Sequence, residues 1–177
     1  MKYFLYDFDD VLTHPGEKNE VFNDFIHILR LRRDKKLTFE RTARMLGWDP
    51  KIIATRQSES MPPNKNIFPM LKLLKAKDQT TGVASNNSIF FISIWLNMYK
   101  LTDYFSVMFT PENLNWSRKP DTAYFSKIIN ILGVIPRDIV FFDDNMENVV
   151  AANKIGINGH TYRGGPFKEV TKYLKEQ

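Results

Sequence analysis

The chain has 177 residues, of which 43% are hydrophobic and 14% aromatic. This much apolar surface excludes a disordered chain, and the length suits one domain with a small inserted lobe. The net charge of +5 is compatible with phosphorylated or other anionic partners without requiring nucleic acid, which we do not expect. The absence of cysteine excludes disulfides, thiolate nucleophiles and cysteine metal sites.

The chain opens with MKYFLYDFDD, a short apolar run that acidic residues soon interrupt. Such a run is too short for a membrane span and lacks the form of a signal peptide. We therefore expect a cytoplasmic protein with no membrane partner, although the sequence leaves export without a signal open.

The first part of the chain predicts one strand followed by three helices. Residues 2–6 are expected to form a buried strand, and a turn follows at Pro15-Gly16. The helical spacing of apolar residues and the capping signals predict helices over residues 20–33, 38–46 and 50–59. Pro62-Pro63 ends this region, so we assign residues 13–62 to a small helical insertion.

From residue 63 onward the pattern alternates between helix and strand. The expected helices cover residues 67–77, 88–99, 121–132, 147–155 and 167–175, and the expected strands cover residues 81–84, 106–109, 139–142 and 159–162. Strands separated by helices indicate right-handed crossovers and parallel pairing. The sequence therefore predicts an α/β fold with a doubly wound, five-stranded parallel sheet, in which residues 1–12 and 63–177 form the core domain.

Polar side chains follow four of the five expected strands. They are Asp7, Asp9 and Asp10 after the first strand, Ser85 and Asn86 after the second, Lys119 after the third, and Asp143 and Asp144 after the fourth. In an open α/β sheet, ligands bind beyond the carboxyl ends of the strands. We therefore expect these side chains to meet at one edge of the sheet.

This set of side chains favours phosphoryl transfer. Converging carboxylates repel one another unless a hard cation lies among them, and Mg²⁺ prefers oxygen ligands. A carboxylate can accept a phosphoryl group as a nucleophile, while a lysine and a hydroxyl before a helix can hold the phosphate oxygens. Asp7 and Asp9, two residues apart on an extended strand, would face one pocket. One of them could attack phosphorus while the other handles the leaving-group proton.

With these residues in place, the chain resembles the haloacid dehalogenase (HAD) superfamily of phosphohydrolases. Four motifs occur in the family's order: Asp7-Phe8-Asp9-Asp10-Val11-Leu12, Val83-Ala84-Ser85-Asn86, Lys119-Pro120-Asp121 and Val140-Phe141-Phe142-Asp143-Asp144-Asn145. The resemblance covers about two-thirds of the chain and implies a HAD-like Rossmannoid core with residues 13–62 as a small α-helical cap. One departure is Asp10, where many members have glycine; we expect it to tune the turn.

The resemblance implies the hydrolysis of a phosphomonoester through an aspartyl-phosphate intermediate. Asp7 would be the nucleophile and a Mg²⁺ ligand. Asp9 would be the general acid and then the general base, with its backbone carbonyl on the metal. Because the dehalogenases of the family lack this second aspartate, Asp9 argues against dehalogenation. A bacterial receiver domain is also disfavoured, since here an acid pair follows the lysine.

The resemblance also implies the residues that bind the phosphate and the metal. Ser85, with Asn86 beside it, and Lys119 would bind the phosphate. Asp144 would bind Mg²⁺ together with Asp7 and Asp9, and Asp143 would lie close behind it.

The substrate stays open at this stage. A small cap leaves the mouth of the site partly open, which would admit a small phosphorylated metabolite or, as the alternative, a phosphotyrosine-type side chain on a protein. A non-catalytic phosphate-binding protein is the alternative from another class. Basic residues of the insertion could attract anionic substrates or simply form a solvated helix end; they are Arg30, Arg32, Arg33, Lys35 and Lys36.

Overall fold

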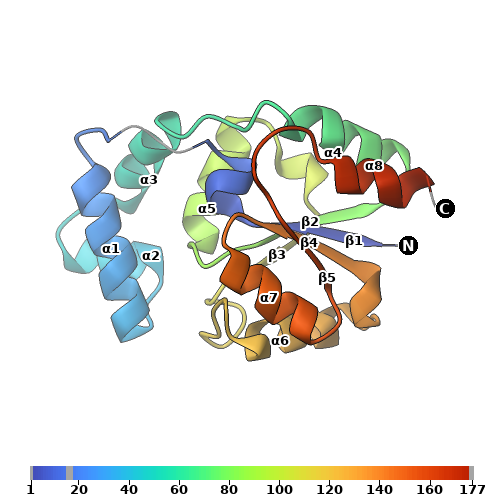
Figure 1. The fold of residues 1–177 in the computed structure, drawn as a ribbon. Helices are drawn as coiled ribbons and strands as arrows, with labels where there is room; N and C mark the ends of the chain where they lie inside the picture. Colours follow the sequence, from blue (N-terminus) through green and yellow to red (C-terminus); the bar gives the residue numbers. More distant parts are fainter. Residues whose placement is uncertain (1, 15–17, 176–177) are drawn as a thin grey trace.

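Five parallel strands form the centre of the computed structural model, which describes residues 2–14 and 18–175 (Figure 1). The strands are β1 (Tyr3–Tyr6), β2 (Thr80–Ala84), β3 (Val107–Phe109), β4 (Ile139–Asp143) and β5 (Asn158–Thr161). They are ordered β3-β2-β1-β4-β5 in the sheet, and every neighbouring pair is parallel. The predicted fold class is confirmed, while the turn predicted at Pro15-Gly16 lies outside the described residues.

Helices precede or follow the strands along the whole chain. They are α1 (Phe22–Lys35), α2 (Phe39–Met45), α3 (Pro50–Glu59), α4 (Ile67–Ala76), α5 (Ile89–Met98), α6 (Thr122–Leu132), α7 (Met146–Lys154) and α8 (Lys168–Lys175). Three short turns were not predicted: η1 (Phe8–Leu12), η2 (Thr102–Tyr104) and η3 (Pro136–Asp138). Among the described residues, no helix combines the length and the apolar character that crossing a bilayer requires.

Alternating side chains of the strands divide the core into two faces. Phe4 and Tyr6 of β1 belong to one buried cluster, which includes apolar residues of α4, α5 and α8. Leu5, between them, belongs to a second cluster with α6 and α7. The two helical layers lie on opposite sides of the sheet in Figure 1. A sheet covered on both faces explains why β1, β3 and β4 read as apolar runs.

The segment between η1 and α4 contains α1, α2 and α3, which lie to one side of the sheet (Figure 1). Its two ends run side by side: Thr13 pairs with Pro63 in an antiparallel bridge, and the Asn64 N–H donates to Leu12 O at 2.9 Å. The insertion packs on α5, where the rings of Phe25 and Phe91 have centroids 4.5 Å apart. Its apolar residues therefore extend the cluster on the α5 face of the sheet.

Candidate active site

The site lies where the strand order reverses. The chain runs from β1 outward to β2 and β3 and then returns to place β4 on the other side of β1, so ligands are expected beyond the carboxyl ends of β1 and β4. Asp7 follows β1 directly, and its N–H donates to Phe142 O of β4 at 2.8 Å. Asp143 is the last residue of β4. The two strands thus bring these aspartates to one edge.

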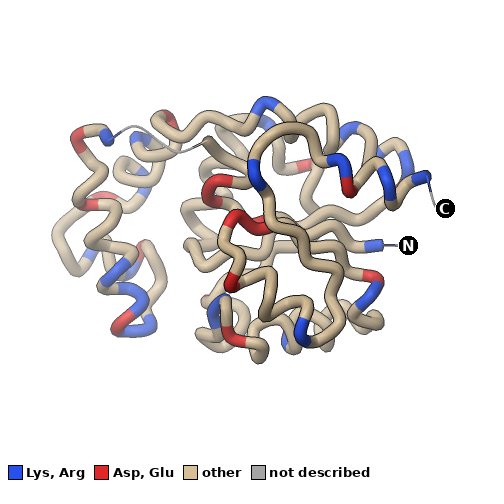
Figure 2. The backbone as a smooth tube through the Cα atoms, viewed as in Figure 1, with Lys and Arg blue, Asp and Glu red and all other residues tan. Residues whose placement is uncertain are grey.

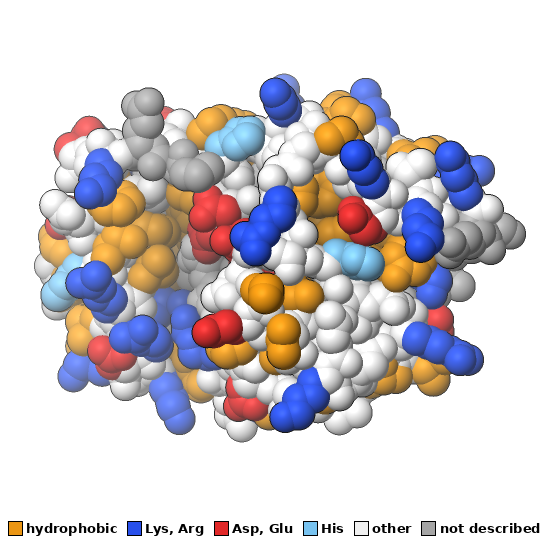
Figure 3. All heavy atoms as spheres, viewed as in Figure 1, with side chains coloured by type: hydrophobic (Ala, Val, Ile, Leu, Met, Phe, Trp, Pro, Cys, Tyr) orange, Lys and Arg blue, Asp and Glu red, His pale blue; other side chains and the backbone are white. Residues whose placement is uncertain are grey.

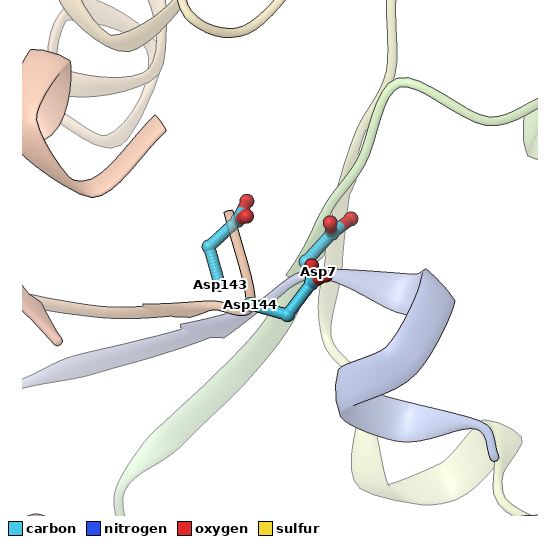
Figure 4. A group of neighbouring side chains, drawn as sticks. All are labelled: Asp7, Asp143 and Asp144. Carbon is cyan, nitrogen blue, oxygen red and sulfur yellow. The ribbon is translucent and has the colours of Figure 1, made fainter. Parts of the chain in front are cut away.

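Asp7, Asp143 and Asp144 form a cluster of carboxylates. One oxygen of each lies within 4.8 Å of the others, and Figure 4 shows the three side chains around one gap between the two strand ends. Asp7 and Asp143 are buried, and Asp144 is partly exposed. Oxygen ligands at this spacing fit Mg²⁺. The geometry includes Asp143 in the acidic group, and the predicted contact of the Asp9 backbone carbonyl with the metal stays a prediction.

Lys119 is buried among the acids. Its Nζ lies 2.9 Å from Asp7 Oδ1 and 2.6 Å from Asp143 Oδ2, and it donates to the carbonyl oxygen of Ala84 at 2.8 Å. Burial is the largest single influence on the pKa of Lys119, and it lowers that pKa. The charges of Asp7 and Asp143 together outweigh burial and hold the pKa above its usual value. The ammonium therefore stays charged beside the predicted nucleophile.

Burial makes both predicted catalytic acids weaker than free aspartate. Loss of water raises the pKa of Asp7 to about 7; Lys119 opposes this shift, and the neighbouring charges of Asp143 and Asp9 add to it. Burial likewise raises the pKa of Asp9 to about 6, against the hydrogen bond from Asn87. A carboxyl group whose pKa lies close to neutral can both give and take a proton.

The segment after β2 carries the predicted phosphate ligands. Ser85 is fully buried, and its Oγ accepts from the Asn87 N–H at 3.1 Å. The Asn86 side chain faces the backbone of Lys119, donating to its carbonyl oxygen and accepting from its N–H, both at 2.9 Å. The Asn86 side chain therefore positions the backbone at Lys119. Its contact with phosphate stays a prediction.

Two asparagines of the site were missed by the sequence reasoning. Asn87 Nδ2 lies 3.2 and 3.3 Å from the two oxygens of Asp9. Asn148 on α7 is buried and donates to both oxygens of Asp143, at 2.9 and 3.0 Å. Asn87 adjoins the second motif and Asn148 lies one helical turn after the fourth, so these positions offered a weak signal. Their partners are visible only in three dimensions.

Asp7 and Asp9 keep extended backbone angles, φ −63° and ψ 156° for Asp7 and φ −70° and ψ 135° for Asp9, although the strand itself ends at Tyr6. Residues 8–12 form a turn that is kinked at Asp9 and Asp10 and buries Phe8. Asp10 within this turn has φ 58°, in the left-handed region that glycine adopts freely and aspartate tolerates. The backbone conformation thus explains why many members of the resembled family have glycine there. The turn also brings acidic residues beside the end of β4, as Figure 2 shows.

One basic residue of the insertion, Arg32, does not belong to a solvated helix end, so that interpretation is wrong for it. Arg30, Arg33, Lys35 and Lys36 remain partly or fully exposed, but Arg32 is completely buried. Its guanidinium pairs with Glu112, Nη2 to Oε1 at 3.1 Å. Arg32 is therefore occupied inside the fold and is not free to attract a substrate from solution.

The metal-free protein is expected to lose stability as the pH rises from about 4 toward about 7. The folded pKa values of Asp7 and Asp9 exceed the ordinary 3.8, so the folded state holds more protons than the unfolded chain in this range. The stabilisation is complete below the ordinary pKa and is lost as both groups ionise, an effect on the order of a few kcal/mol. Mg²⁺ should offset the loss by neutralising the carboxylates.

Thermal unfolding with and without Mg²⁺ at about pH 5 and about pH 8 checks this prediction. Mg²⁺ should raise the melting temperature more at the higher pH. An equal rise at both pH values would contradict the assigned protonation of the acids.

Comparison with known proteins identifies the same group of enzymes. Residues 4–160 match the family described as haloacid dehalogenase-like hydrolase. The chain is 24% identical over 150 residues to an enolase-phosphatase E1 of Caenorhabditis briggsae, covering 84% of this chain and 59% of the relative. It is 33% identical over 90 residues to flavin mononucleotide hydrolase 1 of Arabidopsis thaliana, covering 51% of this chain and 36% of the relative. The chain thus spans only part of the length of these two relatives.

A solved structure extends the likeness to the fold. The HAD family enzyme of Bacteroides thetaiotaomicron, in complex with magnesium and inorganic phosphate, superposes with a TM-score of 0.68 at 21% identity and covers 93% of this chain and 96% of its own. At this identity the likeness establishes the fold alone. Because the family match spans most of the chain and includes three strand ends that carry acids or Ser85, the protein belongs to the haloacid dehalogenase-like hydrolases.

Proposed function

We propose that the protein is a Mg²⁺-dependent phosphomonoesterase that works through an aspartyl-phosphate on Asp7. The observation that carries the proposal is the contact of Lys119 with both Asp7 and Asp143, inside a carboxylate cluster whose oxygens lie within 4.8 Å. Asp7 and Asp144 would hold the metal, with the backbone carbonyl of Asp9 as the further predicted ligand, and Asp143 belongs to the same group of carboxylates. When bound, Mg²⁺ would neutralise the negative charge of the phosphate oxygens.

The arrangement of Asp7 suggests how the first step proceeds. Its Oδ1 accepts from the Phe8 N–H at 2.7 Å and contacts Lys119, which leaves Oδ2 as the attacking oxygen. Oδ2 forms the bond to phosphorus, and the bond from phosphorus to the leaving oxygen breaks. Asp9 gives its proton to that oxygen, so the product leaves as an alcohol.

The second step returns the site to its starting state. Asp9, now ionised, removes a proton from water, and the resulting hydroxide attacks phosphorus. The bond between phosphorus and Asp7 breaks, which releases inorganic phosphate and restores the carboxylate. Asn87 holds the Asp9 carboxylate through both steps. Ser85 and Lys119 would hold the phosphate oxygens, as the family resemblance implies.

We propose a small phosphorylated metabolite as the substrate, bound under residues 13–62 as a cap. A cleft of about 640 Å³ lies beside Asp10 and His14 and is otherwise lined by residues 64–66 and 162–166, so it borders the proposed site without containing Asp7, Ser85 or Lys119. Figure 3 shows acidic side chains at the margin of the hollow between the insertion and the sheet. The name of one relative, flavin mononucleotide hydrolase 1, denotes a small phosphorylated compound, whereas no relative's name supports the phosphoprotein alternative.

A substrate panel tests the proposed function. Purified protein with Mg²⁺ should release phosphate from small phosphomonoesters, should lose this activity on chelation of the metal, and should act poorly on phosphopeptides. Activity confined to phosphopeptides would favour the protein phosphatase alternative. Binding of phosphate without turnover of any compound would favour the non-catalytic alternative.

Asp9→Asn is expected to lower the rate of hydrolysis of alkyl phosphates far more than that of p-nitrophenyl phosphate. An alkoxide needs a proton in order to leave, whereas p-nitrophenolate leaves without one, and general acid catalysis contributes about 10²–10⁴-fold. The ratio of the two kcat/KM values measures the effect. The neighbouring variant Asp10→Asn is the matched control and should leave this ratio unchanged. Equal losses on both substrates in Asp9→Asn would contradict the acid role.

A further inference from the structure

Arg32 links the insertion to the segment that follows β2. It lies on α1 and is fully buried, although arginine usually keeps its charge in water. Its Nη1 and Nη2 donate to the carbonyl oxygens of Asn86 and Asn87, at 3.4 and 3.3 Å. The same guanidinium pairs with Glu112, which lies after β3. One side chain of α1 thus contacts two separate loops of the sheet domain.

Glu112 continues the link to the start of α5. Its Oε1 accepts from Ser88 Oγ at 3.2 Å, and its Oε2 accepts from the Ile89 N–H at 2.8 Å. Ser88 makes no side-chain capping bond of its own, so Glu112 supplies a cap from another part of the chain. Together, Arg32 and Glu112 hold the backbone from residue 86 to residue 89.

The held residues face the catalytic groups on their other side. The Asn86 side chain makes two hydrogen bonds to the backbone of Lys119, and the Asn87 side chain contacts both oxygens of Asp9. Any displacement of this backbone would therefore move the partners of Lys119 and Asp9. Displacements of about 1 Å at a catalytic group can cost about 10²-fold in rate.

We propose that Arg32 is a positioning residue for catalysis, which holds Asn86 and Asn87 where their side chains orient Lys119 and Asp9. This inference rests on the proposed phosphatase function. A buried ion pair adds little net stability compared with a well-packed apolar pair. The directional hydrogen bonds of Arg32, by contrast, reach two backbone carbonyls that no apolar side chain could hold. Arg118 Nη2 also donates to the Asn86 oxygen, at 3.3 Å, so Arg32 and Arg118 share that carbonyl. Arg32 thus couples the position of α1 to the geometry of the catalytic groups.

Arg32→Met is expected to lower kcat for a small alkyl phosphate by about tenfold or more, while KM changes by less than about threefold. Lys119 Nζ keeps its contacts with Asp7, Asp143 and Ala84, so phosphate binding should persist. Arg32→Lys, which keeps the charge and part of the hydrogen bonding, should recover part of the lost rate. Arg33→Met is the matched control, because Arg33 is the exposed neighbour on the same helix and, within the part of the chain that the structure describes, forms an ion pair only with exposed Asp34. It should leave kcat unchanged.

A second variant separates positioning from stability. Arg32→Met leaves Glu112 buried without its cation and should lower the melting temperature. Adding Glu112→Gln removes that unpaired charge, so the double variant should regain melting temperature but not kcat. Recovery of kcat together with the melting temperature would overturn the proposal, as would a wild-type kcat in Arg32→Met.

Amide hydrogen exchange gives a readout that does not need activity. The amides of residues 86–89 should exchange faster in the double variant than in the wild type and in Arg33→Met. Unchanged protection in the double variant would overturn the inference about Arg32. A wild-type protein with no phosphatase activity would instead refute the proposed function, so the two failures are distinguishable.

Discussion

Asp7→Asn is expected to abolish turnover of phosphomonoesters, by roughly 10⁴-fold or more, while the protein stays folded. An amide oxygen is a poor nucleophile and cannot form the proposed acyl phosphate. The fold should not suffer, because burial raises the pKa of Asp7 to about 7 and so disfavours its ionised form. A neutral side chain of the same shape should keep or raise the melting temperature of the metal-free protein at about pH 8.

Measurements of kcat and of thermal unfolding on the same preparation check this prediction. Asp144→Asn is the matched control, since it removes a predicted metal ligand from the same cluster but leaves the nucleophile in place. Its activity should recover in part at high Mg²⁺ concentration, whereas that of Asp7→Asn should not. Appreciable turnover by Asp7→Asn would remove Asp7 from the nucleophilic role.

Lys119→Met is expected to lower both activity and stability. The variant loses the cation that contacts Asp7 and Asp143, so two buried carboxylates face each other without compensation. Removing one partner of a buried ion pair typically costs about 3–5 kcal/mol. The loss should be large at about pH 8 and small near pH 4, because removing Lys119 raises the pKa of Asp7 further and low pH neutralises it. Turnover should fall because the phosphate loses its proposed lysine contact.

Urea unfolding of the metal-free variant across this pH range measures the effect on the free energy of unfolding. Lys127→Met provides a matched control. The Lys127 ammonium is partly buried, and its partners among the described residues are neutral oxygens, Leu114 O at 2.8 Å and Ser117 Oγ at 2.6 Å. The Lys127→Met substitution should lower the free energy of unfolding by about 1 kcal/mol, and this loss should not depend on pH. A pH-independent loss in Lys119→Met would contradict the electrostatic account.

Local signals in the sequence were sufficient to predict most of the fold. Asp49 before Pro50 indicates a helix start, and in the structure its side chain accepts from the N–H groups of Lys51 and Ile52. Gly133 indicates a helix end and has φ 63°. Apolar runs indicated β1, β3 and β4, because a parallel sheet is covered on both faces. These features depend on neighbours along the chain and are therefore readable in one dimension.

Features set by distant partners were not predicted. The η1 turn follows a strand whose end offers no glycine or proline signal, so the sequence did not predict the turn. Arg32 seemed to belong to a solvated helix end, because the acid that neutralises it, Glu112, lies 80 positions away. Asn87 and Asn148 were not predicted for the same reason. Their side-chain amides bind Asp9 and Asp143, and these contacts form only in the folded chain. Burial of polar side chains depends on the complete fold.

Trapping the intermediate tests the central claim most directly. The protein is mixed with Mg²⁺ and a substrate, quenched with acid during turnover, treated with borohydride and analysed by peptide mass spectrometry. Borohydride reduces an acyl phosphate to an alcohol, so the account predicts homoserine in place of aspartate at position 7 and at no other acid of the site. Rapid turnover without modification of Asp7, or a phosphoryl group found on Ser85, would contradict the account.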